Sequence, residues 1–291
     1  MYRTITWVSD TGMTVNMGAE PPYIFNYLTD RLGGNAETSR APRQDGQTTH
    51  FVSLTPRTIN IIGSLVAYGD KQNRAQAVLD RQKSELCRAF APHRFGTLIY
   101  HRANGDVQIR CRPLSIPAFG ERANNTCTVD IELESDVSMW ETSEMYMQVI
   151  GEQQKLWRFP FAFAPLVFGT FAPVGFINNP TTEIIYPEVE IASTAQTVKV
   201  ENVTTGMFIA LNRPIEEHQK MVIQTEDASA AIWERNEAGE WVNIENVSHW
   251  LTLDSDPWGL VPGNNEIRVS NEIPEETPVT QLRYRVPVMG V

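Results

Sequence analysis

Alternation of apolar and polar residues with a period of two is the feature that most constrains the fold of this 291-residue chain. Residues 106–112 and 127–134 each place every second side chain on an apolar face, starting at Val107 and at Cys127. Successive side chains of a strand point to opposite faces of its sheet, so these stretches are expected to be half-buried antiparallel strands. Further strands of the first half are expected at residues 49–54, 57–67 and 96–101. The chain is therefore predicted to be mainly β.

One segment of the first half has helical spacing instead. Apolar residues of the segment 70–90 are spaced four, seven and four apart: Ala75, Leu79, Leu86 and Phe90. This spacing places them on one face of a helix. Asp70 is suited to accept the free N–H groups of the first turn, and Pro92 ends the helix. We predict one amphipathic helix packed across a sheet, with Leu79 and Leu86 buried.

Charge differs between the two halves of the chain. Residues 1–134 carry 15 basic residues, 13 of them Arg, and 13 acidic residues, whereas the remainder carries 9 basic and 22 acidic residues. The net charges are therefore +2 and −13, which together with the length predicts two modules. We expect an N-terminal β domain at residues 1–140, an aromatic and proline-rich connector at 141–181, and a C-terminal domain at 182–291. The overall net charge of −11 argues against a dedicated nucleic-acid-binding protein.

The connector contains a cluster of aromatic residues. Phe159, Phe161 and Phe163 occur at every second position, and Pro160 and Pro165 forbid a continuous helix. One interpretation is a linker pinned onto neighbouring cores. The other is a hydrophobic patch held for a partner subunit, because a monomer rarely leaves so many Phe side chains in water. Under the second interpretation, Phe161 and Phe163 are candidate contact residues.

Short strands recur through the second half. They are expected at residues 189–201, 207–212, 221–225, 231–235, 240–244, 249–253, 265–269 and 280–288. Residues 236–239 fit a four-residue hairpin loop between two of these strands. Such regular spacing of short strands is typical of a β-sandwich.

Metal and cofactor sites have weak candidates. Cys87, His93, His101 and Cys111 are the residue types that bind zinc, but their spacing matches no zinc finger. Both cysteines fall on predicted apolar faces, so we favour buried thiols. The chain also lacks a phosphate loop, a dinucleotide fingerprint and a metalloprotease motif. We expect no metal and no cofactor.

An acidic row on one predicted strand is a candidate carboxylate site. Asp130, Glu132 and Glu134 share one face, as the paired carboxylates of a glycosidase would. The alternative is a solvated face opposite Arg110 and Arg112 of a nearby strand, because cross-strand ion pairs are common. We favour the second interpretation, since no catalytic partner lies within the local motif.

The tryptophans of the second half are a candidate sugar platform. Four of them are available for stacking on a saccharide: Trp233, Trp241, Trp250 and Trp258. For any one of them, packing in the core or at the rim of a small sandwich is the favoured role. The chain also has no run of about 18 apolar residues, so we expect no membrane-spanning helix.

Several short motifs occur in an order known from one family. In the first half they are TINIIG at 58–63, the helix with Arg81 and Leu86, GTLIY at 96–100, VQIRC at 107–111, PAF at 117–119, and the acidic strand continuing to Trp140. In the second half they are INNPT at 177–181, YPEVEI at 186–191, NVTTG at 202–206 and LVPGNN at 260–265. In their order and spacing these motifs resemble the distal tail protein family of siphophages, the bacteriophages with long, non-contractile tails.

The resemblance implies both a fold and a role. It implies an N-terminal β-sandwich with one α-helix and an extended hairpin, followed by a C-terminal galectin-like β-sandwich. It implies a homohexameric ring that joins the tail tube protein to the tail tip or baseplate hub protein, with viral DNA passing through its centre. Such a protein has no catalytic residues, acts in the virion at the tail tip, and is synthesised in the host cytoplasm.

Two interpretations of the function remain open from the residues. The first is the structural ring, in which Arg110 and Arg112, or the acidic row Asp130, Glu132 and Glu134, are candidate subunit contacts. The second is a lectin-like module that recognises host cell-surface glycans through its tryptophans. The balanced charge and 13 Arg of the first half favour the ring, because Arg is enriched at protein interfaces. A glycosidase is the least favoured alternative.

Overall fold

The computed structural model describes residues 3–68, 72–150, 174–192, 194–271 and 279–291. The chain divides into two compact units. The first comprises Met1–Glu144 together with Pro287–Val291, and the second comprises Met145–Val286. Each unit has its own hydrophobic core. The chain is mainly β, as predicted.

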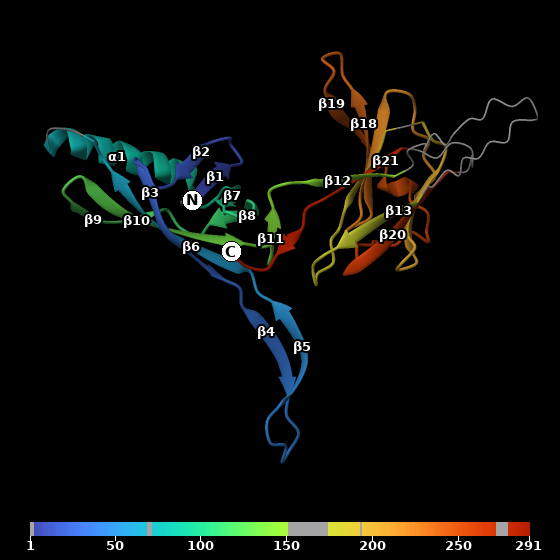
Figure 1. The fold of residues 1–291 in the computed structure, drawn as a ribbon, viewed down its shortest axis with the longest axis horizontal. Coiled ribbons are helices and arrows are strands. Elements are labelled where there is room, and N and C mark those ends of the chain that lie inside the picture. The colour runs from blue at the N-terminus through green and yellow to red at the C-terminus, as the bar shows by residue number, and fades with distance from the viewer. Residues whose placement is uncertain (1–2, 69–71, 151–173, 193, 272–278) are drawn as a thin grey trace, which may run out of the picture. The chain divides into compact units, whose positions relative to one another are not determined.

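The first unit is built on a ten-stranded sheet with the central order β2-β1-β7-β8-β10-β6-β3 (Figure 1). β9 pairs with β10, and β11 pairs with both β8 and β22. The strands of this sheet are β1 (Thr4–Ser9), β2 (Thr14–Met17), β3 (Tyr23–Arg31), β6 (Arg57–Val66), β7 (Gly96–His101), β8 (Val107–Pro113), β9 (Ala118–Ala123), β10 (Thr126–Ser135), β11 (Trp140–Thr142) and β22 (Pro287–Val288). A separate two-stranded sheet consists of β4 (Gly34–Ser39) and β5 (Thr48–Leu54).

The alternation in the sequence becomes the core of this unit. β10 pairs with β6 along its whole length, from Thr126 opposite Val66 to Ser135 opposite Arg57. The inward side chains of β10 are all buried, as predicted: Cys127, Val129, Ile131 and Leu133. The strands expected at residues 96–101 and 106–112 are also present, as β7 and β8, which pair with each other.

The predicted helix is α1, which spans Gln72–Ala89. Leu79 and Leu86 are buried in the first core, as the spacing predicted. The end of the helix is held by Trp7 of β1, whose Nε1 donates to the carbonyl of Ala89 at 2.9 Å. The Trp7 ring also stacks on Phe90, with a centroid separation of 4.9 Å. Asp70, the expected N-cap, lies outside the described residues.

The second unit is a sandwich of two antiparallel sheets. The six-stranded sheet has the order β12-β21-β14-β17-β18-β19, and the four-stranded sheet has the order β13-β20-β15-β16. Their strands are β12 (Tyr146–Ile150), β13 (Val174–Asn179), β14 (Glu188–Ile191), β15 (Val198–Asn202), β16 (Met207–Leu211), β17 (Gln219–Gln224), β18 (Ser229–Arg235), β19 (Trp241–Asn246), β20 (Gly263–Ser270) and β21 (Thr280–Tyr284). Side chains from both sheets, such as Ile223 and Ile209, form one shared core.

Two details of the second half differ from expectation. Residues 189–201 form two strands, β14 and β15, because the chain passes from one sheet of the sandwich to the other. Residues 249–253 are not a strand. Ser248–Trp250 form a 3₁₀ turn, which begins where the Asn246 side chain accepts the backbone N–H of Ser248 at 3.0 Å.

Two further stretches are divided in ways that the sequence did not indicate. The stretch expected as a connector, 141–181, includes β12 and β13, which pair with β21 and β20 of the second unit. The stretch 280–288 is split between β21 in the second unit and β22 in the first. No helix in the described ranges is long and apolar enough to cross a membrane.

Candidate functional site: a buried arginine at the root of an extended hairpin

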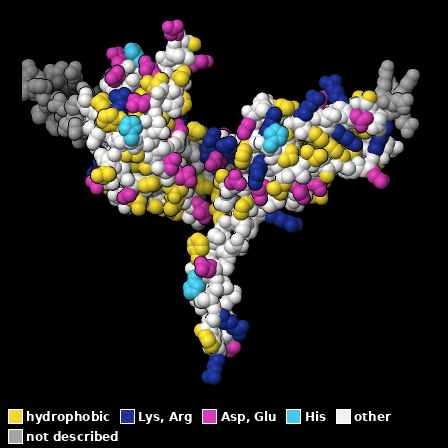
Figure 2. Space-filling view, turned by 180° about the vertical axis from the view of Figure 1, so that it is seen from behind, with side chains coloured by type: hydrophobic (Ala, Val, Ile, Leu, Met, Phe, Trp, Pro, Cys, Tyr) yellow, Lys and Arg dark blue, Asp and Glu magenta, His cyan; other side chains and the backbone are white. Residues whose placement is uncertain are grey.

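The arm, defined here as the β4–β5 hairpin, extends from the ends of β3 and β6 (Figure 1). Every residue of β4 is exposed, and β5 exposes three large apolar side chains. Phe51, Val52 and Leu54 are 61%, 55% and 48% exposed. Their cross-strand neighbours are Glu37, Ala36 and Gly34, which offer little apolar cover. Hydrophobic side chains are visible along the arm in Figure 2.

The tip of the arm has a defined hydrogen-bonding pattern. The Gln44 side chain accepts the backbone N–H of Ala41 at 2.9 Å and donates to the Thr48 hydroxyl at 3.0 Å. Arg40 Nε donates to the Gln44 carbonyl at 3.0 Å. Gly46 takes a φ of +84°, a left-handed conformation that favours glycine. The turn is therefore shaped by its own side chains.

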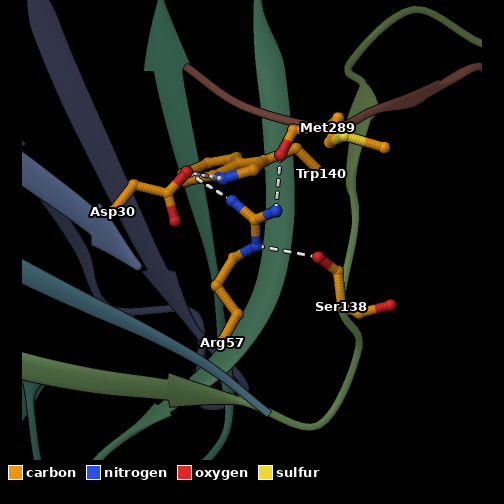
Figure 3. Close-up of polar contacts among 5 residues, drawn as sticks. All are labelled: Asp30, Arg57, Ser138, Trp140 and Met289. Carbon is orange, nitrogen blue, oxygen red and sulfur yellow. Dashed lines mark hydrogen bonds and ion pairs between the residues drawn. The ribbon is translucent and has the colours of Figure 1, made fainter. Parts of the chain in front are cut away.

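Arg57 lies at the root of the arm, as the first residue of β6 (Figure 3). Its side chain is 1% exposed, although it carries a permanent charge. Nη1 donates to Asp30 Oδ2 of β3, which makes an ion pair between the two strands that lead into the arm. Nε donates to the Ser138 carbonyl at 2.8 Å, and Nη2 donates to the Met289 carbonyl at 2.6 Å.

Trp140 completes the cluster around the arginine. Its Nε1 donates to Asp30 Oδ2 at 3.1 Å, so the same carboxylate oxygen receives two donors (Figure 3). Trp140 is fully buried and pairs with Val288 across β11 and β22. A buried charge is tolerated only when it is paired and hydrogen-bonded. Sequence analysis did not anticipate this cluster, because a single Arg at the start of a strand is indistinguishable from a surface residue.

The predicted contact residues of the first unit lie on β8 and β10. Arg112 Nη2 contacts Glu134 Oε2 at 2.9 Å, which confirms a cross-strand ion pair between the two predicted faces. Arg110 lies 4.0 Å from Asp10 and over the Phe95 ring.

The other predicted contacts differ in their surroundings. Glu132 is exposed, lies opposite Asn60 of β6, and has no ion pair among the described residues. Asp130 is half-buried and lies opposite Ile62. Phe161 and Phe163 lie outside the described residues. Neither the Asp130 nor the Glu132 carboxylate has an ion pair among the described residues, and Glu132 is the exposed one of the two.

The four candidate zinc ligands, Cys87, His93, His101 and Cys111, do not form a metal site. Within the described ranges, no group of three or more His, Cys, Asp or Glu side chains is placed to hold a metal ion. Cys111 is buried in the first core, and burial raises the pKa of its thiol well above the usual range. Such a thiol is a poor ligand and nucleophile at neutral pH.

A hydroxyl–imidazole–carboxylate relay is a feature that sequence analysis did not anticipate. His101 Nε2 lies 2.9 Å from the Thr6 hydroxyl, and His101 Nδ1 lies 2.7 Å from Asp106 Oδ2. The Thr6 hydroxyl also donates to Asn16 Oδ1 at 2.8 Å. The relay joins neighbouring strands of the sheet, and its side chains are partly or fully exposed. We interpret it as cross-strand hydrogen bonding.

Two tryptophans of the second unit face cations of their own chain. Lys220 Nζ lies 4.7 Å from the Trp241 ring centroid and 5.9 Å from that of Trp233. Arg235 lies 5.0 Å from the Trp241 centroid. Lys220 is itself held by Glu190, at 2.8 Å. These cations occupy ring faces of Trp233 and Trp241 on which a bound saccharide would stack.

We therefore expect no millimolar or tighter binding of cell-wall saccharides by this protein. The measurement is a saccharide titration of the full chain, followed by NMR of the tryptophan indole N–H signals. Shifts confined to Trp233 or Trp241 would contradict this expectation and support the lectin interpretation. Trp258, which is buried, provides the internal reference signal.

Comparison with known protein families matches both units of the chain. A family described as siphovirus-type tail component, C-terminal domain, matches residues 180–286. A family described as phage tail protein RIFT-related domain matches residues 15–135. The two matches together cover more than half of the chain. No curated protein sequence matches it.

Solved structures with a similar fold come from phage adsorption machinery. The crystal structure of the SPP1 Dit protein (gp 19.1), described as a paradigm of hub adsorption apparatus in phages infecting Gram-positive bacteria, has 10% identity and a TM-score of 0.64. The similarity covers 98% of this chain and 99% of that one. A chain of the phage P2 baseplate in its activated conformation with Ca has 11% identity and a TM-score of 0.57, covering 100% and 99%.

The fold and the family matches agree with the order of motifs in the sequence. The structural similarity extends over both units, and the family matches assign each unit to a tail component. The chain therefore belongs to the siphophage distal tail protein family and is a structural component of the phage tail.

Proposed function

We propose that this protein forms a homohexameric ring that joins the tail tube to the tail tip or baseplate hub, with viral DNA passing through its centre. The arm is the observation that carries the proposal. A two-stranded hairpin is at best marginally stable in water by itself. The arm nevertheless exposes Phe51, Val52 and Leu54 along one strand. A neighbouring copy of the chain would cover these side chains in a closed ring.

The charge of the two halves supports the same arrangement. Residues 1–134 are nearly balanced, with a net charge of +2, and are rich in Arg. Copies of such a surface can approach closely and form bidentate contacts with carboxylates. The remainder carries −13 and would repel its copies if packed at the centre of a ring. We therefore place the first unit at the centre and the second unit outside.

The remaining features of the proposal concern partners and location. The protein would contact the tail tube protein on one side and the hub protein on the other, after synthesis in the host cytoplasm. Phe161 and Phe163 remain candidate contacts for a partner subunit. The proposed role is structural and requires no enzymatic activity.

Assembly should depend on the apolar side chains of the arm. Six copies of the 32.8 kDa chain have a mass of about 197 kDa, and light scattering distinguishes this mass from a single chain. Replacing Val52 and Leu54 together by Ser removes apolar contact area without touching either core, so the variant is expected to shift towards single chains. Ser53→Ala, on the same strand, is the matched control and should assemble like the parent.

Two results would contradict this proposal. One is a parent chain that stays monomeric at high concentration, both alone and with tail tube protein. The other is equal assembly of the parent and the Val52→Ser, Leu54→Ser variant. That result would show that these side chains of the arm do not take part in the subunit contact.

Glu132 provides an electrostatic test of the same interface. Its carboxylate is exposed and has no ion pair among the described residues. If this face meets the next subunit, Glu132→Arg should weaken assembly more at low salt than at high salt, because screening reduces charge interactions. Glu237→Arg, in an exposed loop of the second unit, is the matched charge reversal and should leave assembly unchanged. Equal effects of both variants at every salt concentration would exclude a specific role for this face.

A further inference from the structure

The last residues of the chain belong to the first unit, although the residues just before them belong to the second. We call Pro287–Val291 the return segment. Its β22 pairs with β11, with Val288 opposite Trp140 and Pro287 opposite Glu141. Val288 packs against the first core. The return segment lies beyond the residues matched by either family, which end at 135 and 286.

The arm root and the return segment share one side chain. Arg57 donates to Asp30 at the end of β3, and it also donates to the Met289 carbonyl of the return segment. A guanidinium is planar and rigid, so its donors cannot be reoriented independently. We propose that the return segment is a latch: its seating on β11 and Arg57 fixes the root of the arm.

Unseating the segment has a defined physical consequence. The Arg57 Nη2 donor would lose its acceptor inside a buried site, and Trp140 would lose its neighbour Val288. A buried charged donor without a partner is strongly unfavourable. The guanidinium relieves this cost by turning towards water, which breaks its bond to Asp30. The strands that lead into the arm then lose the ion pair that joins them.

The latch also couples the second unit to the arm. Only Arg285 and Val286 separate the end of β21 in the second unit from Pro287 in the first. So short a connection transmits displacement of β21 to the residues that Arg57 holds. A change in the second unit can therefore alter the arm through this chain connection. This coupling extends the proposed ring function but does not depend on ring formation.

Hydrogen–deuterium exchange of the full chain tests the latch. Deleting Pro287–Val291 should accelerate exchange of the β4–β5 amides about tenfold or more, because the arm root opens locally. Exchange of β14 and β17 in the second unit should not change. Deleting only Val291 leaves the Met289 carbonyl in a peptide bond and keeps Val288, so this control should match the parent. Light scattering of the same samples measures assembly. Loss of assembly tests the proposed ring, whereas exchange in the arm tests the latch.

A second variant keeps the test decisive if the deletion prevents folding. Val288→Ser retains all five residues but weakens their seat on the core, so it should accelerate exchange in the arm more than in β1 and β7. A peptide of residues 284–291 added to the deletion variant should restore protection of the arm. Equal acceleration across all strands of the first unit would overturn the latch and leave a general stabilising role. Unchanged exchange in the arm would overturn it completely.

Discussion

Replacing Arg57 by Met is expected to lower the free energy of unfolding of the first unit by about 3–5 kcal/mol. Met fills a similar volume but removes every donor of the guanidinium. Asp30, which is 10% exposed, would then have only the Trp140 indole N–H as a donor. The carbonyls of Ser138 and Met289 would also lose their donor. Urea unfolding monitored by circular dichroism measures the change.

Two further variants identify the cause of that loss. Arg31→Met is the matched control, because Arg31 follows Asp30 on β3 but is exposed. It should change stability by no more than about 0.5 kcal/mol. Combining Arg57→Met with Asp30→Leu removes both charges, so part of the lost stability should return. A single Arg57→Met variant as stable as the parent would show that the buried cluster does not hold the arm root.

Leu86→Ala is expected to lower the free energy of unfolding of the first unit by about 2–5 kcal/mol. Leu86 is fully buried where α1 packs on the sheet, so truncation leaves a cavity in the first core. The spread in the expected value reflects how far neighbouring side chains relax into that cavity. Thermal and urea unfolding of the variant and the parent provide the measurement.

The control for this prediction lies on the same helix. Arg88 is exposed on α1, so Arg88→Ala removes a long side chain of the helix without opening the core. Its effect should stay within about 0.5 kcal/mol. If Leu86→Ala and Arg88→Ala unfolded alike, α1 would not be packed against the first core in solution.

The contact candidates show how far local patterns extend. The sequence placed basic residues of β8 opposite acidic residues of β10, and the structure contains the ion pair between Arg112 and Glu134. The sequence did not indicate which acidic residues of β10 would have no ion pair. Glu132 lies opposite Asn60 of β6, on the other side of β10. Strand order decides such neighbours, and alternation along one strand carries no information about strand order.

The sequence by itself determined the helix, the strands with uninterrupted alternation such as β8 and β10, and the buried face of each. Period-two alternation buried Cys127, Val129, Ile131 and Leu133, and helical spacing buried Leu79 and Leu86. These are local properties, because burying one face of an element requires only that its own residues repeat with the period of that element. The order of motifs likewise pointed to the tail protein family before the fold was known.

Only the tertiary structure decided the arm root and the return of the chain to its first unit. Arg57 finds partners that are 27, 81 and 232 residues away in the sequence: Asp30, Ser138 and Met289. The sequence predicts one strand at residues 280–288, but this stretch is divided between the two units. No periodicity encodes contacts at such separations. They exist because burying a charged side chain requires partners from whichever segments the completed fold brings to it.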